Sequence, residues 1–118
     1  MHELSLAQSL LEIVLRHADK NGAVRVQRLV LSFGRMSCIE PRALETAFAV
    51  TAAGTRAEGA RLSFTIHPVV VSCLSCEREY TLEDHGVLVC PSCGDAKVVV
   101  VGGTEDLELI EMEVDAEE

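Results

Sequence analysis

Residues 73–76 read Cys-Leu-Ser-Cys and residues 90–93 read Cys-Pro-Ser-Cys, with thirteen residues between them. We call these stretches the first and the second knuckle. Each can turn two thiolates toward one point, and four thiolates around one point form the tetrahedral shell of a structural Zn²⁺ site. The spacing is close to that of known zinc sites, with a slightly shorter loop, and Gly94 can take the left-handed backbone that wraps a sulfur. The predicted zinc ligands are Cys73, Cys76, Cys90 and Cys93.

Two disulfides and a thioredoxin-like redox motif are the alternatives for these cysteines. A redox motif needs one Cys-x-x-Cys pair at the start of a helix, and no helical pattern follows either knuckle. The knuckles and the remaining Cys38 fit a reducing compartment better than a disulfide scaffold. Residues 1–20 lack the basic start and the continuous apolar run of a signal peptide. We therefore expect structural zinc in a cytoplasmic protein.

The charge balance disfavours nucleic acid as a partner. The chain has 118 residues with 10 Lys and Arg against 19 Asp and Glu, so its net charge is −9, and only 3% of its residues are aromatic. Nucleic-acid readers need a basic patch to neutralise phosphates, or aromatic platforms on which bases stack. No stretch approaches the roughly 18 apolar residues of a membrane span. The length predicts one compact unit, or one unit with a small insertion.

Hydrophobic periodicity predicts two helices and four strands. Residues 4–20 carry an apolar stripe at helical spacing, with Ser5 and Gln8 as a candidate capping box and Glu3 as the rival N-cap. A second helix begins at Pro41 and stops at Gly54. The predicted strands are 24–33, 62–67, 98–101 and 107–114.

The strand over 24–33 has an irregular phase. Val24 and Val26 share one face in this prediction, while Leu29, Leu31 and Phe33 take the other, and a bulge near residue 28 would reconcile them.

The order of these elements predicts an α+β fold: two helices on a small mixed three-stranded sheet, with an inserted zinc-ribbon-like domain bearing a four-cysteine site. The last strand returns to the first sheet. The predicted domains are 1–68 plus 104–118, and 69–103. About thirty-five residues bury little core, so metal ligation supplies the missing folding free energy of the insertion.

The first three residues, Met1-His2-Glu3, offer nitrogen donors in sequence. The Met1 amine, the His2 amide and the ring Nδ1 of His2 can chelate one metal, and the Glu3 amide or carboxylate can complete a four-coordinate plane. Such a site selects Ni²⁺ or Cu²⁺. The amine has a reference pKa of about 7.7–8.0, so a metal can displace its proton near neutral pH. A frayed polar end is the alternative.

Met1-His2-Glu3 before an amphipathic helix, Gly34 leading to Glu40-Pro41, and the two knuckles together resemble the HypA/HybF family of nickel metallochaperones over essentially the whole chain. The resemblance implies a protein that binds Ni²⁺ as cargo at Met1, His2 and Glu3, with His2 the essential ligand, and Zn²⁺ as a structural cofactor at the four cysteines. It implies delivery of nickel to the large-subunit precursor of nickel–iron hydrogenase, or in some members to urease, with a HypB-type GTPase as partner.

Other residues receive structural interpretations. Glu40 is predicted to be a helix-start carboxylate, with a place near the nickel site as the alternative. Cys38 is predicted to be buried or half-buried. His17, His67 and His85 are expected on a helix surface, on the polar face of a strand and in a solvated loop.

We therefore expect a carrier rather than an enzyme, because four sulfur ligands leave zinc no open position. The first alternative is a zinc-ribbon module that binds a protein partner or nucleic acid. The second is a zinc-dependent redox or hydrolytic enzyme, for which only Cys38 offers a further thiol. The sequence is compatible with either a monomer or a homodimer.

Overall fold

The computed structural model describes residues 3–82 and 88–116. Their contacts group the chain into two compact units. The first contains the described residues up to Leu31, Ile39–Phe64 and the residues from Leu109 on; the second contains Ser32–Cys38 and Thr65–Glu108. The strands of the described residues form two separate three-stranded sheets. The domain boundaries expected from the sequence, at residues 68/69 and 103/104, remain a prediction.

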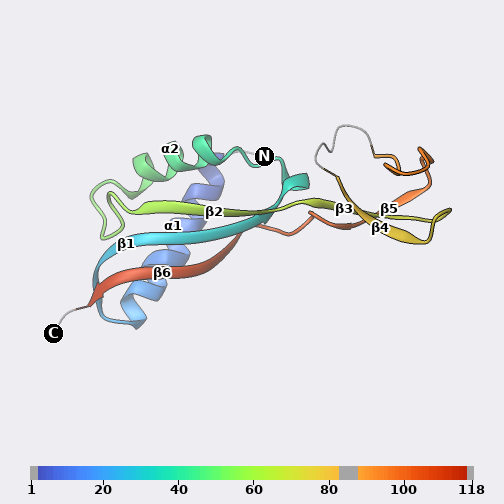
Figure 1. Ribbon diagram of the computed structural model, residues 1–118. Coiled ribbons are helices and arrows are strands. Elements are labelled where there is room, and N and C mark those ends of the chain that lie inside the picture. Colours follow the sequence, from blue (N-terminus) through green and yellow to red (C-terminus); the bar gives the residue numbers. More distant parts are fainter. Residues whose placement is uncertain (1–2, 83–87, 117–118) are drawn as a thin grey trace. The chain divides into compact units, whose positions relative to one another are not determined.

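The first sheet is mixed and carries both helices. Its strand order is β2-β1-β6, with β1 (Ala23–Gly34) in the centre between β2 (Arg61–His67) and β6 (Glu108–Ala116). Figure 1 shows β1 and β2 running in the same direction and β6 running against them. The helices are α1 (Glu3–Lys20) and α2 (Pro41–Ala52), which contact each other. The predicted α+β fold, with the last strand returning to the first sheet, is confirmed.

The helices form because their apolar residues recur every three or four positions and so bury one face. On α1 these buried residues are Ala7, Leu10, Val14 and Ala18, and on α2 they are Leu44, Phe48 and Ala52. The centre of the sheet supplies the opposite side of this core, since Leu29 and Leu31 of β1 are fully buried.

The start of α1 does not have the capping box that the sequence suggested, whereas the start of α2 is as predicted. Helix α1 begins at Glu3, so Ser5 lies within its first turn and the predicted capping box is wrong. Helix α2 has Pro41 at its first position and Glu40 at its N-cap, where the Glu40 carboxylate accepts a hydrogen bond from the Arg42 N–H at 3.2 Å. The helix-start role expected for Glu40 is confirmed.

At the beginning of β1, the buried residues do not follow the alternation expected of a strand. Val24 is 50% exposed while Val26 is fully buried, so the two valines differ in burial although the sequence predicts them on one face. The buried residues are three apart at first, at positions 23, 26 and 29, and from residue 31 to the end of the strand every residue is buried. Burial therefore follows the neighbouring elements of the first unit more closely than strict alternation.

The second sheet is antiparallel, and two of its strands were not predicted. Its order is β4-β3-β5, with β3 (Val69–Cys73) between β4 (Arg78–Leu82) and β5 (Val98–Gly102). Val71 pairs with Tyr80 on one side and Val100 on the other. The side chains of Val71, Tyr80 and Val100 belong to a small hydrophobic core of the second unit. Its members are Val69, Val71 and Leu82, with Met36, Tyr80, Leu88, Val98 and Val100 packed against them.

A close crossing of backbones joins the short helix η1 (Arg35–Ser37) to the segment after β5. The Gly34 N–H donates to the Glu105 carbonyl and the Met36 N–H to the Gly103 carbonyl, both at 2.8 Å. A Cβ on Gly34 would lie 2.2 Å from the Gly103 oxygen, and one on Gly103 would lie 2.8 Å from the Pro68 oxygen. Both positions therefore exclude a side chain. Among the described residues, no helix has the length and apolar character needed to cross a membrane.

Candidate metal centre

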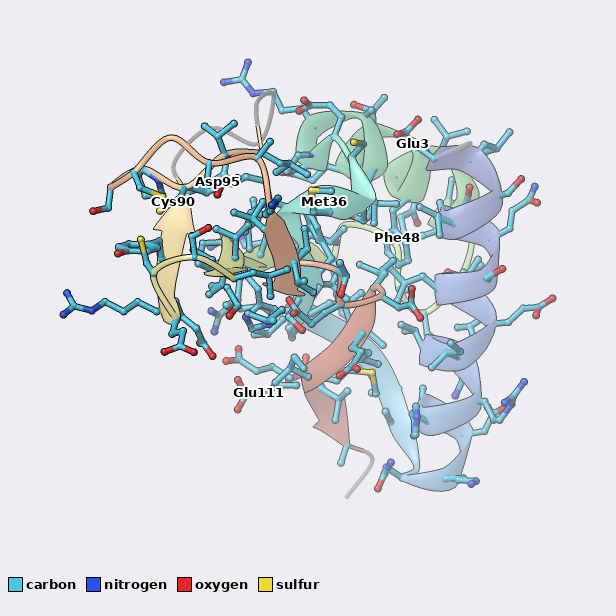
Figure 2. The ribbon with its side chains drawn as sticks, turned by 90° about the vertical axis from the view of Figure 1, so that its right-hand side faces the viewer. Glu3, Met36, Phe48, Cys90, Asp95 and Glu111 are labelled. Atoms are coloured by element: carbon cyan, nitrogen blue, oxygen red, sulfur yellow. The ribbon has the colours of Figure 1, made fainter. Side chains whose placement is uncertain are left out.

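The four knuckle cysteines converge at one end of the second sheet. Cys73 is the last residue of β3, Cys76 lies in the turn before β4, and the second knuckle precedes β5. Their four sulfurs all lie within 4.8 Å of one another. Cys73 and Cys90 are buried, and Figure 2 shows Cys90 with Asp95 beside this turn. The structure thus brings together all four residues predicted as zinc ligands.

The two knuckles have the same local geometry. In each, the N–H of the second cysteine points at the sulfur of the first, at 3.4 Å from Cys76 to Cys73 and 3.5 Å from Cys93 to Cys90. In each, the residue after the second cysteine donates its N–H to the carbonyl of the first cysteine at 2.9 Å.

That following residue takes a left-handed conformation in both knuckles. It is Glu77, with φ of 57°, after the first and Gly94, with φ of 74°, after the second. The backbone wrap expected at Gly94 is confirmed. Because Glu77 has a Cβ, the same conformation is less favourable there, by about 1–2 kcal/mol. Its presence shows that the fold of the first knuckle overrides this local preference.

The sulfur positions fit a tetrahedral cation. Zn–S bonds of about 2.3 Å in a regular tetrahedron place the sulfurs about 3.8 Å apart. The Cys73 and Cys93 sulfurs are 3.8 Å apart, and those of Cys76 and Cys90 are 3.9 Å apart. A disulfide would require about 2.05 Å, so the four cysteines are free thiols at ligand spacing. With four protein sulfurs, the shell leaves no open position for a substrate.

Without a cation, the thiols of this cluster hold their protons unequally. Burial raises the pKa of the Cys90 thiol, but hydrogen bonds from the backbone N–H groups of Cys93 and Ser92 outweigh it and lower the pKa to about 6. Hydrogen bonding to the Cys93 sulfur, and next to the Cys73 sulfur, raises the pKa of Cys76 to about 12. One thiolate therefore forms easily while another resists ionisation, and a bound dication would stabilise all four.

The other candidate residues do not join a second cluster. In the described part of the chain, the knuckle cysteines are the single group of three or more His, Cys, Asp or Glu side chains with converging ligand atoms. Cys38 is exposed, with φ of 59°, so the prediction that it is at least half-buried is wrong. It ends the short helix η1 rather than entering a core, which spacing along the sequence does not reveal.

The predicted nickel ligands lie mostly outside the described residues. Met1 and His2 are not described, nor is His85; Glu3 is the half-buried first residue of α1. His17 is exposed on α1, and His67 ends β2 in a half-buried position.

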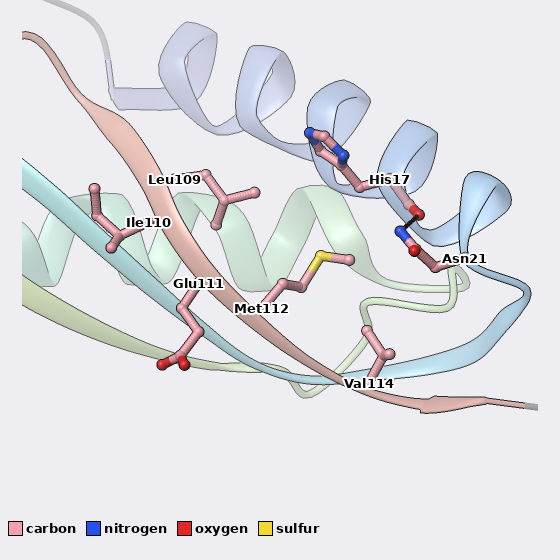
Figure 3. A pocket seen from close by; sticks show the side chains of 7 residues that line it. All are labelled: His17, Asn21, Leu109, Ile110, Glu111, Met112 and Val114. Atoms are coloured by element: carbon pink, nitrogen blue, oxygen red, sulfur yellow. Dashed lines mark hydrogen bonds between the residues drawn. The ribbon is translucent and has the colours of Figure 1, made fainter.

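A pocket of about 360 Å³ in the first unit lies between the end of α1 and strand β6 (Figure 3). Its lining residues are His17, Asn21, Leu109, Ile110, Glu111, Met112 and Val114. Figure 3 shows the Glu111 carboxylate pointing away from the His17 ring. The pocket therefore brings no pair of ligating groups together.

Sequence reasoning missed one residue beside the cluster. Asp95 accepts hydrogen bonds from the Ser75 hydroxyl at 2.5 Å and from the Lys97 N–H at 2.9 Å. The Ser75 hydroxyl lowers the pKa of the Asp95 carboxyl below its usual value. An aspartate after a Cys-x-x-Cys-Gly stretch was the available signal, but its partner is 20 residues away in sequence.

A small α+β chain with a mixed sheet, a separate antiparallel sheet and four converging thiols defines a metal-binding protein with a structural, zinc-type centre. Comparison with known proteins narrows this class. Residues 1–114 match the family described as "Hydrogenase/urease nickel incorporation, metallochaperone, hypA". The chain belongs to this HypA family of nickel metallochaperones of hydrogenase maturation.

Relatives of known name agree with this assignment. The hydrogenase maturation factor HypA of Syntrophus aciditrophicus is 44% identical over 98% of this chain and 100% of its own length. That of Aquifex aeolicus is 38% identical over the same shares. The solution structure of the nickel metallochaperone HypA from Helicobacter pylori is 26% identical, covers 99% of this chain and 100% of its own, and superimposes with a TM-score of 0.64. The resemblance inferred from the sequence is confirmed.

Proposed function

We propose that this protein is a nickel carrier. It binds Ni²⁺ through Met1, His2 and Glu3, and delivers it to the immature large subunit of nickel–iron hydrogenase. The observation that carries this proposal is the family match, which begins at residue 1 and therefore includes the nitrogen-rich Met1-His2-Glu3 stretch. The family description names nickel incorporation for hydrogenase and urease, and urease is the second candidate recipient.

The chemistry of the first residues suits a transferable metal. Amine, amide and imidazole nitrogens favour the planar geometry that Ni²⁺ accepts. Glu3 begins α1, and the first backbone N–H groups of a helix have no partner within it, so metal binding does not compete with helix formation. A ligand set at a chain end can exchange its donors one at a time in a docked complex.

Zinc has a different role in this proposal. Cys73, Cys76, Cys90 and Cys93 hold Zn²⁺ in a closed shell that stabilises the second unit, and the closed shell makes the protein a carrier rather than an enzyme. We assign the exchange to the cytoplasm, where such thiols stay reduced. A HypB-type GTPase and the hydrogenase large-subunit precursor are the proposed partners, and the net charge of −9 disfavours nucleic acid.

A nickel titration of protein that begins at Met1, beside a version with one extra residue before Met1, tests the nickel site. We expect the extension to abolish tight nickel binding while zinc stays bound, because the extension moves the amine away from the His2 chelate. Equal nickel affinity of the two versions would place the metal elsewhere.

A pair of histidine variants makes the test specific. His2→Ala should lose nickel and keep zinc. His17→Ala removes an exposed imidazole from the surface of α1 and should change neither metal. Loss of nickel binding in His17→Ala, with full binding in His2→Ala, would contradict the proposed ligand set.

A further inference from the structure

One residue contacts both knuckles. Asp95 follows the second knuckle, and its carboxylate accepts a hydrogen bond from the hydroxyl of Ser75, in the middle of the first knuckle, at 2.5 Å. Its backbone carbonyl accepts the N–H of Cys90, the first ligand of the second knuckle, at 2.9 Å. The second carboxylate oxygen accepts the Lys97 N–H, also at 2.9 Å, which anchors the side chain next to β5.

A second bond runs parallel to this connection. The Leu74 N–H donates to the Lys97 carbonyl at 3.0 Å, so Lys97 binds the first knuckle through one backbone group and Asp95 through the other. Residues 95–97 thus form a strap that touches the first knuckle at two neighbouring residues. Neither contact involves a sulfur, and neither needs a metal.

The two knuckles differ in the partner of their serine hydroxyl. Ser75 and Ser92 occupy the same position within their Cys-x-Ser-Cys stretches. The hydroxyl of Ser75 meets a carboxylate of the other knuckle's strap, whereas Ser92 interacts with Tyr80 of β4. The bond across the knuckles is therefore a specific feature of Ser75 and Asp95, and the repeated knuckle motif does not by itself produce it.

We propose that Asp95 is a positioning residue that joins the two knuckles through Ser75 and so holds the four sulfurs at ligand spacing. This inference rests on the proposed zinc site. Hydrogen bonds to a charged group are stronger than neutral ones, and partners behind the ligands orient a metal site.

The proposal predicts slower metal release, since differences in affinity appear mainly in dissociation rates. A bound metal would be freed by separation of the two knuckles, and the Ser75–Asp95 bond opposes that separation. The carboxylate acts through the serine hydroxyl rather than on the metal. The Asp95 carboxylate therefore changes the rate of metal dissociation and leaves the four sulfur ligands unchanged.

The test measures release of zinc from the full chain to an excess of a colorimetric chelator. Asp95→Ala and Ser75→Ala should each release zinc about tenfold faster, the low end of the effect of such supporting residues because Ser75 is exposed and Asp95 only half-buried. The double variant should match Asp95→Ala, because that change alone already removes the Ser75–Asp95 bond. Ser75→Thr keeps the hydroxyl and should restore slow release.

A control and a spectroscopic readout complete the design. Asp106→Asn removes an exposed carboxylate of the same unit and should leave release unchanged. Co²⁺ in place of zinc should give the same sulfur-to-metal charge-transfer bands in wild type and in Asp95→Ala, which shows that the ligands are retained.

Three results would overturn the inference. Release from Asp95→Ala at the wild-type rate, or effects of the two alanines that multiply in the double variant, would show that Asp95 does not position the knuckles through Ser75. Altered charge-transfer bands in Asp95→Ala would show a direct role at the metal. A wild-type chain that binds neither zinc nor Co²⁺ through four sulfurs would instead overturn the zinc site itself.

Discussion

In the thiol cluster, the pKa of Cys90 is lowered and the pKa of Cys76 is raised. Backbone N–H groups lower the pKa of Cys90 to about 6, whereas bonding to neighbouring sulfurs raises the pKa of Cys76 to about 12. The Asp95 backbone N–H lowers the pKa of Cys93, but bonding to the Cys90 sulfur and burial raise it above its usual value. The metal-free cluster at neutral pH thus combines an ionised thiol with protonated ones. Zn²⁺ must displace these protons when it binds, so its affinity for the four thiols depends on pH.

We predict that uptake of one Zn²⁺ at pH 7 releases at least two protons, from Cys76 and Cys93. The zinc form binds fewer protons than the metal-free form, so lowering the pH favours release, by about one decade of affinity per proton and pH unit. Below about pH 6 Cys90 also takes up a proton, and the dependence steepens. Calorimetry in buffers of different ionisation enthalpy measures the proton count, and an affinity independent of pH would contradict it.

At the scale of residues, the cysteine spacing was sufficient to predict that the four thiols converge, whereas the exposure of Cys38 and the contacts of Asp95 were not accessible from the sequence. Cys38 is exposed because it ends a short helix that the sequence pattern did not show. Asp95 acquires its role from Ser75, a residue that only the folded chain brings near.

Among the elements, α2 shows how a local signal decides where a helix begins. Pro41 supplies the φ of the first turn, and the Glu40 carboxylate accepts the otherwise unpaired N–H of Arg42. Sequence alone was enough here, because the cap and its partner are two residues apart. In β1, by contrast, packing with residues distant in sequence decided that Val26 is buried and Val24 is exposed.

We predict that Glu40→Ala lowers the free energy of unfolding by about 1 kcal/mol, the usual effect of losing an N-cap side chain, and leaves nickel affinity unchanged. Urea denaturation gives the first quantity and a nickel titration the second. Glu45→Ala, on the exposed face of the same helix, is the matched control and should change neither. A folded Glu40→Ala protein with weakened nickel binding would show that Glu40 is a ligand.

The two glycines of the backbone crossing give a second prediction at the scale of elements. Gly103→Ala combines a φ of 92° with a Cβ 2.8 Å from backbone atoms of Pro68 and Val69, and should destabilise the protein by about 2–4 kcal/mol. Gly22→Ala, with φ of 62° but nothing within 4 Å, should cost about 1 kcal/mol. Thermal denaturation compares them, and equal losses would contradict the close packing of Gly103.

In the molecule as a whole, the two units differ in the source of their stability. The first buries stripes from two helices against the centre of a sheet. In the described part of the second unit, the buried apolar side chains beside the cysteines are Phe33, Val69, Val71 and Leu82. A core of this size contributes little against the entropy of ordering the segment, and metal ligation supplies the difference.

We therefore predict that removing zinc unfolds the second unit first. Hydrogen exchange of the chelated protein should show lost protection of the amides in β3, β4 and β5, with α1 and α2 still protected, because the helices do not depend on the metal. Cys73→Ser should have the same effect as the chelator, and Cys38→Ser is the matched control without effect on zinc. Uniform loss of protection in both units would contradict this separation.

The sequence by itself determined, of the elements in the described residues, both α-helices and four of the six strands, together with the four converging cysteines and the family. These signals are local: apolar periodicity, caps and Cys-x-x-Cys pairs act over a few residues, and each carries its own physical preference. Only the tertiary structure decided that 69–73 and 78–82 form strands, which face of β1 is buried at its start, that Gly34 and Gly103 must lack side chains, and that Asp95 joins the knuckles. Those features depend on residues that are far apart in the chain, and their free energies exist only when folding brings the partners together.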